Sequence, residues 1–162
     1  PGTVVVILDS CLSGQFIQSK GSAVAANNAY NQSIVSAFAA SNANNYVQSK
    51  ALTDSPIKGK YKILTAASSM NTSNSFGLII DGVRVDGGLF TLFLAEGMGY
   101  DAVHEAAADL ESDADKDGVV TLAEAYSYVD RNVKAFEKNF NLSYQQTQVW
   151  PKGDRTAILA RN

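Results

Sequence analysis

The hydrophobic positions of the chain fall into short continuous runs and into segments of helical spacing. Two runs, residues 3–8 and 61–66, are largely apolar or β-branched and have the length of single strands, a pattern typical of strands buried on both faces of a parallel sheet. Both runs end in small polar residues. Because the ends of parallel strands meet at one edge of a sheet, we expect the two polar segments to frame a cleft there.

Apolar residues recur at helical spacing in four further segments, each of which predicts a helix: 27–40, 89–98, 101–112 and about 122–138. The second segment is apolar nearly all round, which predicts a buried helix that stops near Gly97 or Gly99. The third is rich in alanine, a strong helix former, and contains Val103, Ala106, Ala107 and Leu110 at the spacing i, i+3, i+4, i+7.

The remaining segments predict short strands, turns and loops. The Asp81-Gly82 pair between two β-type runs is the usual signature of a two-residue hairpin turn. Residues 145–151 have an extended pattern, and residues 156–160 predict a short strand. Residues 18–26 and 41–60 are polar and predict surface loops. Since no internal repeat or long linker divides the sequence, we expect one domain, or the larger part of one.

Composition narrows the classes of protein to consider. The chain has 162 residues, of which 46% are hydrophobic, so it is long enough for one domain with a real core. A net charge of -3 gives no broad positive field, which argues against nucleic acid and against anionic membranes as partners. No apolar run approaches the roughly 18 residues of a membrane span.

The start of the chain predicts that the sequence belongs to something longer. Pro1 is followed almost at once by a core strand, with no initiator Met and no signal segment. That strand, residues 3–8, needs partners on both sides, and the rest of the chain offers few long apolar strands to supply them.

Cys11 is the single cysteine of the chain, and it follows the first strand within an Asp-Ser-Cys-Leu-Ser-Gly segment. A cysteine at the carboxyl end of a buried strand can be presented on a tight turn, where its thiolate attacks a carbonyl carbon. Buried structural filler is the other interpretation of a lone cysteine. A phosphatase loop is excluded, because Ile17 stands where that chemistry needs an arginine, and Asp9 breaks the G-x-S-x-G elbow pattern.

The apolar strand followed by Asp9-Ser10-Cys11-Leu12-Ser13-Gly14 resembles the nucleophile segment of caspase-like cysteine peptidases, in particular metacaspases and their bacterial relatives. Three other segments are similar to parts of that family: 61–69 to the next sheet strand, 87–94 to the helix after it, and 153–160 to the closing strand. The resemblance implies an α/β fold, a three-layer αβα sandwich with a mainly parallel sheet. It makes residues 1–162 the C-terminal portion of one peptidase domain, whose N-terminal part is missing from this chain.

The resemblance also implies a Cys–His dyad, with Cys11 as nucleophile and the histidine upstream of it. A glycine after that histidine shares the oxyanion hole with the Cys11 backbone N–H. No histidine precedes Cys11 in this sequence, and the one histidine, His104, falls in the predicted helix 101–112. We therefore expect the histidine to come from a preceding segment of the same gene product, either attached or cleaved off as a separate chain. Autoprocessing is common in the family, although a bond before Pro1 is a poor cleavage site.

Asp9 has a second implied role, because metacaspase-like enzymes use the Asp two positions before the Cys to line the S1 pocket. A carboxylate there pairs with Arg or Lys, which predicts cleavage of polypeptides after basic residues. An aspartate at this place can also simply initiate a turn by bonding its own backbone. Ser68 and Ser69, at the end of the next strand, are weaker candidates for substrate contact.

Residues 113–124 match the calcium-binding loop of an EF-hand at every diagnostic position. Oxygen ligands at positions 1, 3, 5, 7, 9 and 12 of such a loop would come from Asp113, Asp115, Asp117, the Val119 carbonyl, Thr121 and Glu124. Gly118 occupies the position of the sharp turn, and predicted helices flank the loop on both sides. Four carboxylates in so short a segment repel one another, and a calcium ion relieves that repulsion.

Two functional hypotheses follow. The first is a calcium-dependent cysteine endopeptidase with no organic cofactor; the second is a catalytically inactive caspase-like protein that serves as a calcium-binding scaffold or interaction module. The acidic loop has its own alternative, a solvated turn that caps the next helix, because EF-hands usually work in pairs and one is visible here. The Ser/Asn-rich sequence and the calcium motif are compatible with an exported bacterial protein.

Overall fold

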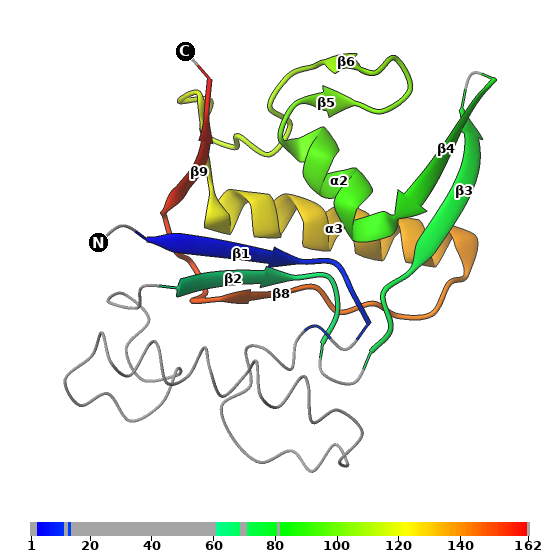
Figure 1. Ribbon diagram of the computed structural model, residues 1–162, viewed down its shortest axis with the longest axis horizontal. Coiled ribbons are helices and arrows are strands. Elements are labelled where there is room, and N and C mark those ends of the chain that lie inside the picture. The colour runs from blue at the N-terminus through cyan, green and yellow to red at the C-terminus, as the bar shows by residue number, and fades with distance from the viewer. Residues whose placement is uncertain (1–2, 12, 14–60, 69–70, 81, 162) are drawn as a thin grey trace, which may run out of the picture.

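The central sheet has the strand order β1-β2-β8 in the computed structural model, which describes residues 3–11, 13, 61–68, 71–80 and 82–161 (Figure 1). β1 (Val4–Leu8) pairs in parallel with β2 (Tyr61–Thr65), and β2 pairs antiparallel with β8 (Gln148–Trp150). The Ala66 N–H donates to the Leu8 carbonyl at 2.8 Å, which continues the parallel pairing past the end of β2. The two strands predicted to end at one edge therefore do so.

The burial of β1 differs from the prediction of a strand buried on both faces. Val4 and Ile7 are 37% and 41% exposed. Among the described residues β1 pairs with β2 alone, so β1 lies at an edge of this sheet. β2 has a neighbour on each side and is buried from Lys62 to Thr65. The apolar pattern of β1 is thus that of an inner strand, although its position here is that of an edge strand.

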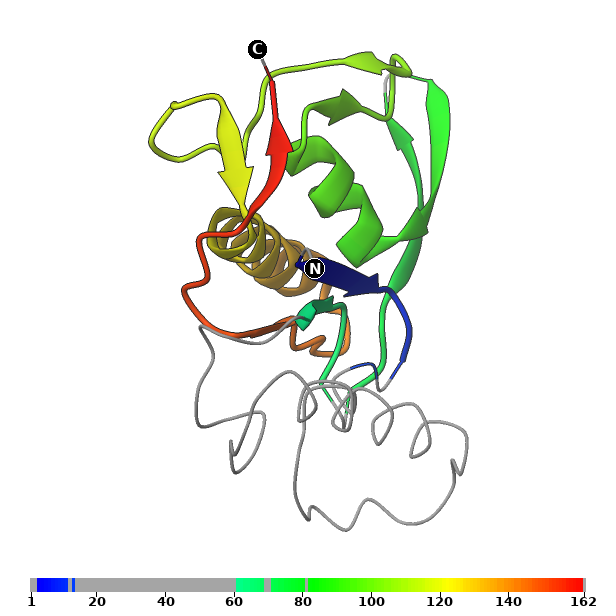
Figure 2. The ribbon, with the colours of Figure 1, turned by 60° about the vertical axis from the view of Figure 1, so that its left-hand side comes forward.

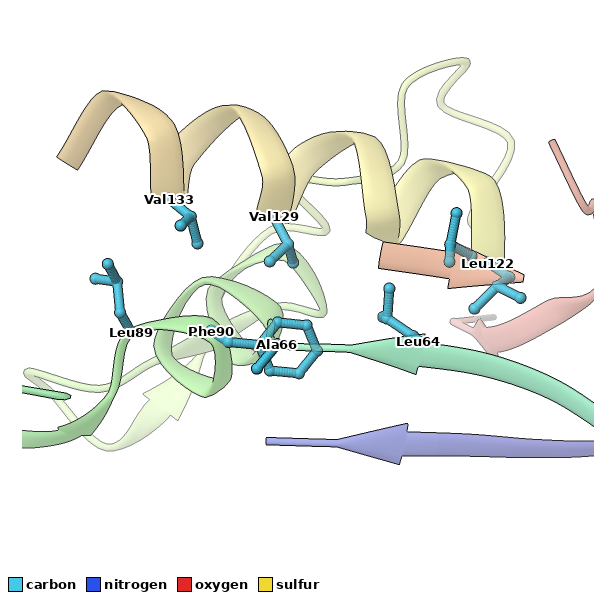
Figure 3. Close-up of a cluster of buried hydrophobic side chains, with 8 residues drawn as sticks. Leu64, Ala66, Leu89, Phe90, Leu122, Val129 and Val133 are labelled. Atoms are coloured by element: carbon cyan, nitrogen blue, oxygen red, sulfur yellow. The ribbon is translucent and has the colours of Figure 1, made fainter. Parts of the chain in front are cut away.

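Two helices lie on the same side of the sheet, α2 (Leu89–Gly97) and α3 (Leu122–Phe140) (Figures 1 and 2). Both were predicted with nearly these bounds. Their apolar side chains, those of β2 and β8, and the residue after β2 form the core in Figure 3, which consists of Leu64, Ala66, Leu89, Phe90, Leu122, Val129, Val133 and Val149. Burial of this cluster supplies the main stabilisation of the described part of the chain.

α3 begins with a capping box. The Thr121 hydroxyl accepts from the Glu124 N–H at 3.3 Å, and the Glu124 carboxylate accepts from the Thr121 N–H at 2.9 Å. Two further N–H groups of the first turn donate to the carbonyls of Thr156 and Asp154. Asp154 also forms a buried ion pair with Lys62 of β2 at 2.6 Å, so the segment before the last strand connects the start of α3 to the sheet.

A hairpin of β3 (Ser75–Ile80) and β4 (Val83–Gly88) extends from the body of the molecule (Figure 1). Ile80 pairs with Val83, which leaves two residues for the turn, as predicted. Gly82 has a φ of 82°, a value that a glycine adopts at no steric cost. β4 leads directly into α2, so the hairpin fixes where that helix starts.

The prediction of a helix at 101–112 is wrong. The chain there forms β5 (Tyr100–Asp101), a turn and β6 (Ala106–Ala107), which pair antiparallel. The Asp101 carboxylate accepts the N–H groups of Val103 and His104, at 2.8 and 3.1 Å, and these bonds stabilise the turn. Glu105 has a φ of 50°, which lies outside the right-handed helical region.

Two predicted strands near the end of the chain are confirmed. β8 lies within the extended segment 145–151, and β9 (Ala157–Ala160) lies within the predicted strand 156–160. β9 pairs antiparallel with β7 (Val119–Thr121), a short strand inside the acidic loop.

The fold class is mixed α/β. One strand pair of the described residues is parallel and the others are antiparallel, so these residues do not form a three-layer sandwich around a parallel sheet. The predicted helix 27–40 and the predicted loops 18–26 and 41–60 lie outside the described residues. Neither α2 nor α3 combines the length and apolar content that crossing a membrane requires.

Candidate functional site

Cys11 lies in a turn directly after β1, and its side chain is exposed. The Ser13 N–H donates to the Ser10 carbonyl at 3.3 Å, which closes the turn. Ser13 is fully buried, and its hydroxyl donates to the Ala67 carbonyl at 3.2 Å while accepting from the Ala67 N–H at 3.0 Å. The turn that presents the thiol is therefore fastened to the end of β2.

Asp9 lies two residues before the thiol and is also exposed. Its two carboxylate oxygens accept from two hydroxyls: Ser73 Oγ donates to Oδ1 at 2.7 Å, and Thr91 Oγ1 donates to Oδ2 at 2.6 Å. Ser73 belongs to the loop before β3, and Thr91 to the first turn of α2. Asp9 bonds these distant side chains rather than its own backbone, unlike the turn-initiating aspartate considered from the sequence.

Ser68 is buried, and its hydroxyl donates to the Asn71 side chain. Asn71 in turn donates to the Tyr144 carbonyl at 3.2 Å, so Ser68 belongs to the packing of the loop that follows β2. Ser69, the other serine proposed for substrate contact, lies outside the described residues.

His104 lies in the turn between β5 and β6, across α2 from β1 (Figures 1 and 2). Its Nδ1 is 2.5 Å from Asp101 Oδ2, and this hydrogen bond lowers the pKa of the Asp101 carboxyl. His104 is thus an exposed turn residue bonded to Asp101, and its predicted helix is absent.

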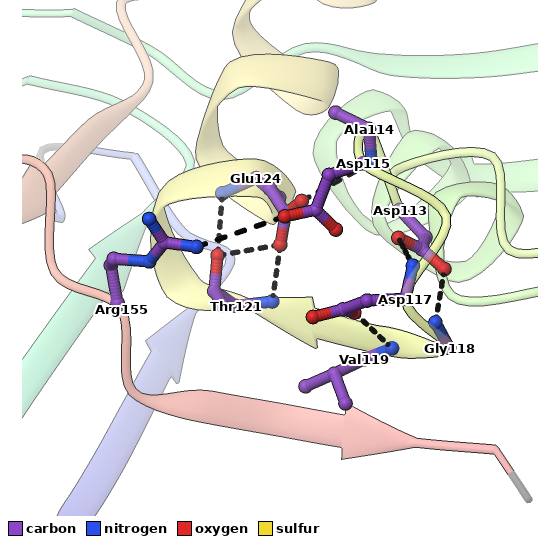
Figure 4. Close-up of polar contacts among 9 residues, drawn as sticks. All are labelled: Asp113, Ala114, Asp115, Asp117, Gly118, Val119, Thr121, Glu124 and Arg155. Atoms are coloured by element: carbon purple, nitrogen blue, oxygen red, sulfur yellow. Dashed lines mark hydrogen bonds and ion pairs between the residues drawn. The ribbon is translucent and has the colours of Figure 1, made fainter.

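The acidic loop brings together three of its predicted ligands (Figure 4). Carboxylate oxygens of Asp113, Asp115 and Asp117 lie within 4.8 Å of one another. Asp113 accepts from the N–H groups of Asp117 and Gly118, at 3.2 and 2.8 Å, and Asp117 accepts from Val119 N–H at 2.8 Å. These bonds curl the backbone around the carboxylates, and Gly118 has a φ of 82° at the sharp turn.

Two other predicted ligands, Thr121 and Glu124, bond to each other. The Glu124 carboxylate accepts from the Thr121 hydroxyl at 2.7 Å and reaches back to the Ala114 N–H at 3.2 Å. Burial opposes ionisation of Glu124, but the hydrogen bonds from Thr121 and Ala114 outweigh it and lower its pKa. The charged carboxylate at position 12 therefore lies over the start of the loop while it caps α3.

The surroundings of the loop correct the expectation of flanking helices. α3 follows the loop, but the segment before it is the β5–β6 hairpin and irregular chain rather than a helix. β7 of the loop pairs with β9, and the Arg161 N–H donates to the Gly118 carbonyl at 2.9 Å. An exposed cation also approaches the ligands, because Arg155 Nη2 lies 3.7 Å from Asp115 Oδ2.

The donor set fits a hard divalent cation. Carboxylate, carbonyl and hydroxyl oxygens are the ligands that calcium prefers, and the loop has no thiol or imidazole. Its residues would supply charge and oxygen atoms, and a bound ion would relieve the repulsion among the three aspartates.

Sequence reasoning missed the two hydroxyls that hold Asp9. Ser73 stands in a polar loop with no distinguishing pattern, and Thr91 reads as a polar interruption in an apolar helix. The one available signal was the place of Thr91 in the first turn of a helix that follows two glycines.

Comparison of the chain with protein-family models, with curated proteins and with solved structures finds no significant match.

Proposed function

We propose that this chain is the nucleophile-bearing part of a caspase-like cysteine endopeptidase that cleaves after Arg or Lys. The observation that carries the proposal is that an exposed thiol, Cys11, follows β1 two residues after an exposed carboxylate, Asp9, which two hydroxyls hold in place. Open α/β sheets place their chemistry at such strand ends. The Asp-Ser-Cys-x-Ser-Gly resemblance supports the same assignment.

Cys11 would act as the nucleophile. Its thiolate attacks the carbonyl carbon of the scissile bond, the C–N bond breaks, and a thioester forms. A histidine supplied by a segment upstream of this chain takes the thiol proton and gives it to the leaving amine. Water then attacks the thioester, which releases the acid and restores the thiol.

The same proposal extends to the fold. β1 has an inner-strand sequence, yet within the described residues one of its edges is unpaired. A preceding segment that adds strands at this edge would bring in the histidine and enlarge the sheet toward the proposed three-layer αβα sandwich. Asp9 would then select an Arg or Lys side chain of the polypeptide substrate.

The test uses the full-length gene product and a peptide series that differs at P1 alone. We expect turnover with Arg or Lys at P1, none with Asp, and none in a Cys11→Ala variant with unchanged circular dichroism. Best turnover with Asp at P1, or equal turnover by Cys11→Ala, would contradict the proposal.

The inactive scaffold is the competing function, and the residues encoded before Pro1 discriminate the two. A His-Gly pair after an apolar strand there supports the peptidase. Its absence, together with failure of an Arg-chloromethylketone to label Cys11, supports the scaffold.

We also propose that residues 113–124 bind calcium, on the grounds of the three converging aspartates and the EF-hand positions. Calorimetric titration should show calcium binding with a preference over magnesium, and calcium should raise the melting temperature. Asp115→Asn should weaken binding about tenfold or more, because it removes one of the converging charges. Asp109→Asn, an exposed charge outside the loop, is the matched control; equal effects of the two variants would contradict a specific site.

A further inference from the structure

We infer that Ser73 and Thr91 are positioning residues that orient the Asp9 carboxylate to receive the guanidinium or ammonium group of a substrate. This inference rests on the proposed cleavage after basic residues. It adds two residues, from two separate elements, to the specificity site for which the sequence proposed Asp9, with Ser68 and Ser69 as weaker candidates.

The first support is the geometry of the carboxylate. Ser73 Oγ and Thr91 Oγ1 each donate to a different oxygen of Asp9, at 2.7 and 2.6 Å. Two donors from two elements fix both the position and the plane of a carboxylate. An arginine side chain binds a carboxylate through two parallel hydrogen bonds, so the plane of the acceptor decides how well it is held.

The second support is the charge that remains on Asp9. Hydroxyls are neutral donors, and none of the ion pairs among the described residues includes Asp9. A carboxylate offers about four lone-pair sites, of which the two hydroxyls use two. Asp9 therefore keeps its exposure, its negative charge and acceptor capacity on each oxygen, which is what a cationic side chain requires.

The third support is the space provided by Gly88. A Cβ at Gly88 would stand 3.1 Å from Asp9 Cγ and closer still to Oδ2. Gly88 has φ −76° and ψ 132°, which any residue adopts, so backbone conformation does not require glycine here. What the glycine provides is room for the carboxylate at the start of α2.

The fourth support is the fixation of the loop that carries Ser73. The next residue, Asn74, donates its side-chain N–H to Glu137 at 3.0 Å and its backbone N–H to Gln145 Oε1 at 2.6 Å. Its carbonyl accepts from the Leu89 N–H at 2.9 Å, at the start of α2. Glu137 and Gln145 are both buried, so the Ser73 hydroxyl is held on a tightly bonded segment.

The experiment measures cation binding and cleavage separately in the full-length gene product. Three variants test the role: the double variant Ser73→Ala/Thr91→Val, the single variant Gly88→Ala, and Thr91→Ser, which keeps a hydroxyl at that position. Thr72→Ala removes an exposed hydroxyl of the same loop and serves as the control. Benzamidine is the binding probe, because it carries an amidinium and needs no catalytic histidine. Peptides with Arg or citrulline at P1 report kcat and KM.

Loss of both hydroxyls should weaken benzamidine binding about tenfold or more, and should raise KM for the Arg peptide by a similar factor with a small effect on kcat. Gly88→Ala should behave likewise, while Thr91→Ser and Thr72→Ala should stay close to wild type. The circular dichroism and the urea midpoint of each variant should be unchanged, which a general loss of structure would not allow.

The outcomes separate the two proposals. Unchanged benzamidine affinity in the double variant, or no benzamidine binding by the wild type, overturns the positioning role whatever the peptidase result. Benzamidine binding that depends on the hydroxyls, without cleavage of any peptide, overturns the peptidase and leaves the cation site. An equal loss for Arg and citrulline peptides overturns the positioning role as well.

Discussion

The Ser13 hydroxyl and the backbone of Ala67 bond each other in both directions, at 3.2 and 3.0 Å, although the two residues are 54 positions apart in sequence. Ser13→Ala would leave the buried Ala67 N–H without this acceptor, whereas the Ala67 carbonyl keeps the Thr65 hydroxyl as a donor. We expect the free energy of unfolding to fall by about 1–3 kcal/mol, measured by urea denaturation. Ser10→Ala, at an exposed position of the same turn, is the control, and an equal loss there would contradict the account.

The Lys62–Asp154 ion pair predicts a large effect when one partner is removed. Its side chains are 5% and 10% exposed. Lys62→Met leaves the Asp154 carboxylate buried without its cation and should cost about 3–5 kcal/mol of unfolding free energy. Adding Asp154→Asn should recover much of that loss, because the amide is neutral and can still accept from the Thr156 N–H. A double variant no more stable than Lys62→Met would contradict the prediction.

Glu137 predicts a dependence of stability on pH. Burial raises its pKa, and the hydrogen bonds from the Gln145 N–H and the Asn74 side chain offset this in part. The folded state therefore holds the Glu137 proton more tightly than the unfolded state does. Unfolding releases that proton between the usual glutamate pKa of about 4.3 and the raised folded value, so this group lowers the unfolding free energy as pH rises through that window.

Glu137→Gln removes this contribution, because glutamine does not titrate there. The unfolding free energy of Glu137→Gln minus that of the wild type should increase from about pH 4 to pH 7, measured by urea denaturation at each pH. Glu105→Gln, an exposed carboxylate outside the core, serves as the control. If this difference in unfolding free energy stays flat or decreases with pH, burial of Glu137 does not make the stability of the protein depend on pH.

Removal of the Arg155 charge should raise calcium affinity, whereas substitution of a calcium ligand such as Asp115 should lower it. Its guanidinium lies 3.7 Å from the Asp115 carboxylate, so it competes with a cation for the same charge. Arg155→Gln should tighten calcium binding about twofold to fivefold at low ionic strength and less at high salt, because both side chains are largely exposed. Lys152→Gln, an exposed cation of the neighbouring turn, should change affinity less; equal gains would point to net charge alone.

The elements that the sequence predicts correctly are those whose signals are local. Helix α3 combines strong apolar periodicity with a capping box, and the β3–β4 hairpin has the Asp-Gly turn that a two-residue connection needs. The strands at 3–8 and 61–66 were recognised from their short length, their apolar and β-branched content and the small polar residues that follow them. In each case propensity and pattern indicate the same structure.

The prediction of a helix at 101–112 failed because the contacts that stabilise the observed structure come from residues distant in sequence. Alanine side chains bury little apolar area, so their burial stabilises a helix only weakly against hydrogen bonds that favour another backbone path. The Arg161 side chain donates to the carbonyls of Gly99 and Ala108, and the Ser112 hydroxyl donates to the Gly97 carbonyl. These partners hold the segment in an irregular path that no local pattern reveals.

Part of the candidate site could be predicted from the sequence, and the part that could not depends, like segment 101–112, on residues distant in sequence. Cys11 and Asp9 are close in sequence and follow a recognisable strand, so the segment itself indicates them. Their supports, Ser73 and Thr91, come from other elements and are ordinary residues in their own segments. Nothing short of the folded arrangement relates those hydroxyls to Asp9.

The pairing of β7 with β9 limits how the acidic loop can be used outside this protein. The oxygen donors of residues 113–124 are contiguous, which makes the loop look like a portable tag. Its short strand, however, is completed by β9, and the start of α3 is bonded by the carbonyls of Asp154 and Thr156. A graft of residues 113–140 alone would carry the donor atoms without the scaffold that shapes them; a transferable module has to include residues 154–161.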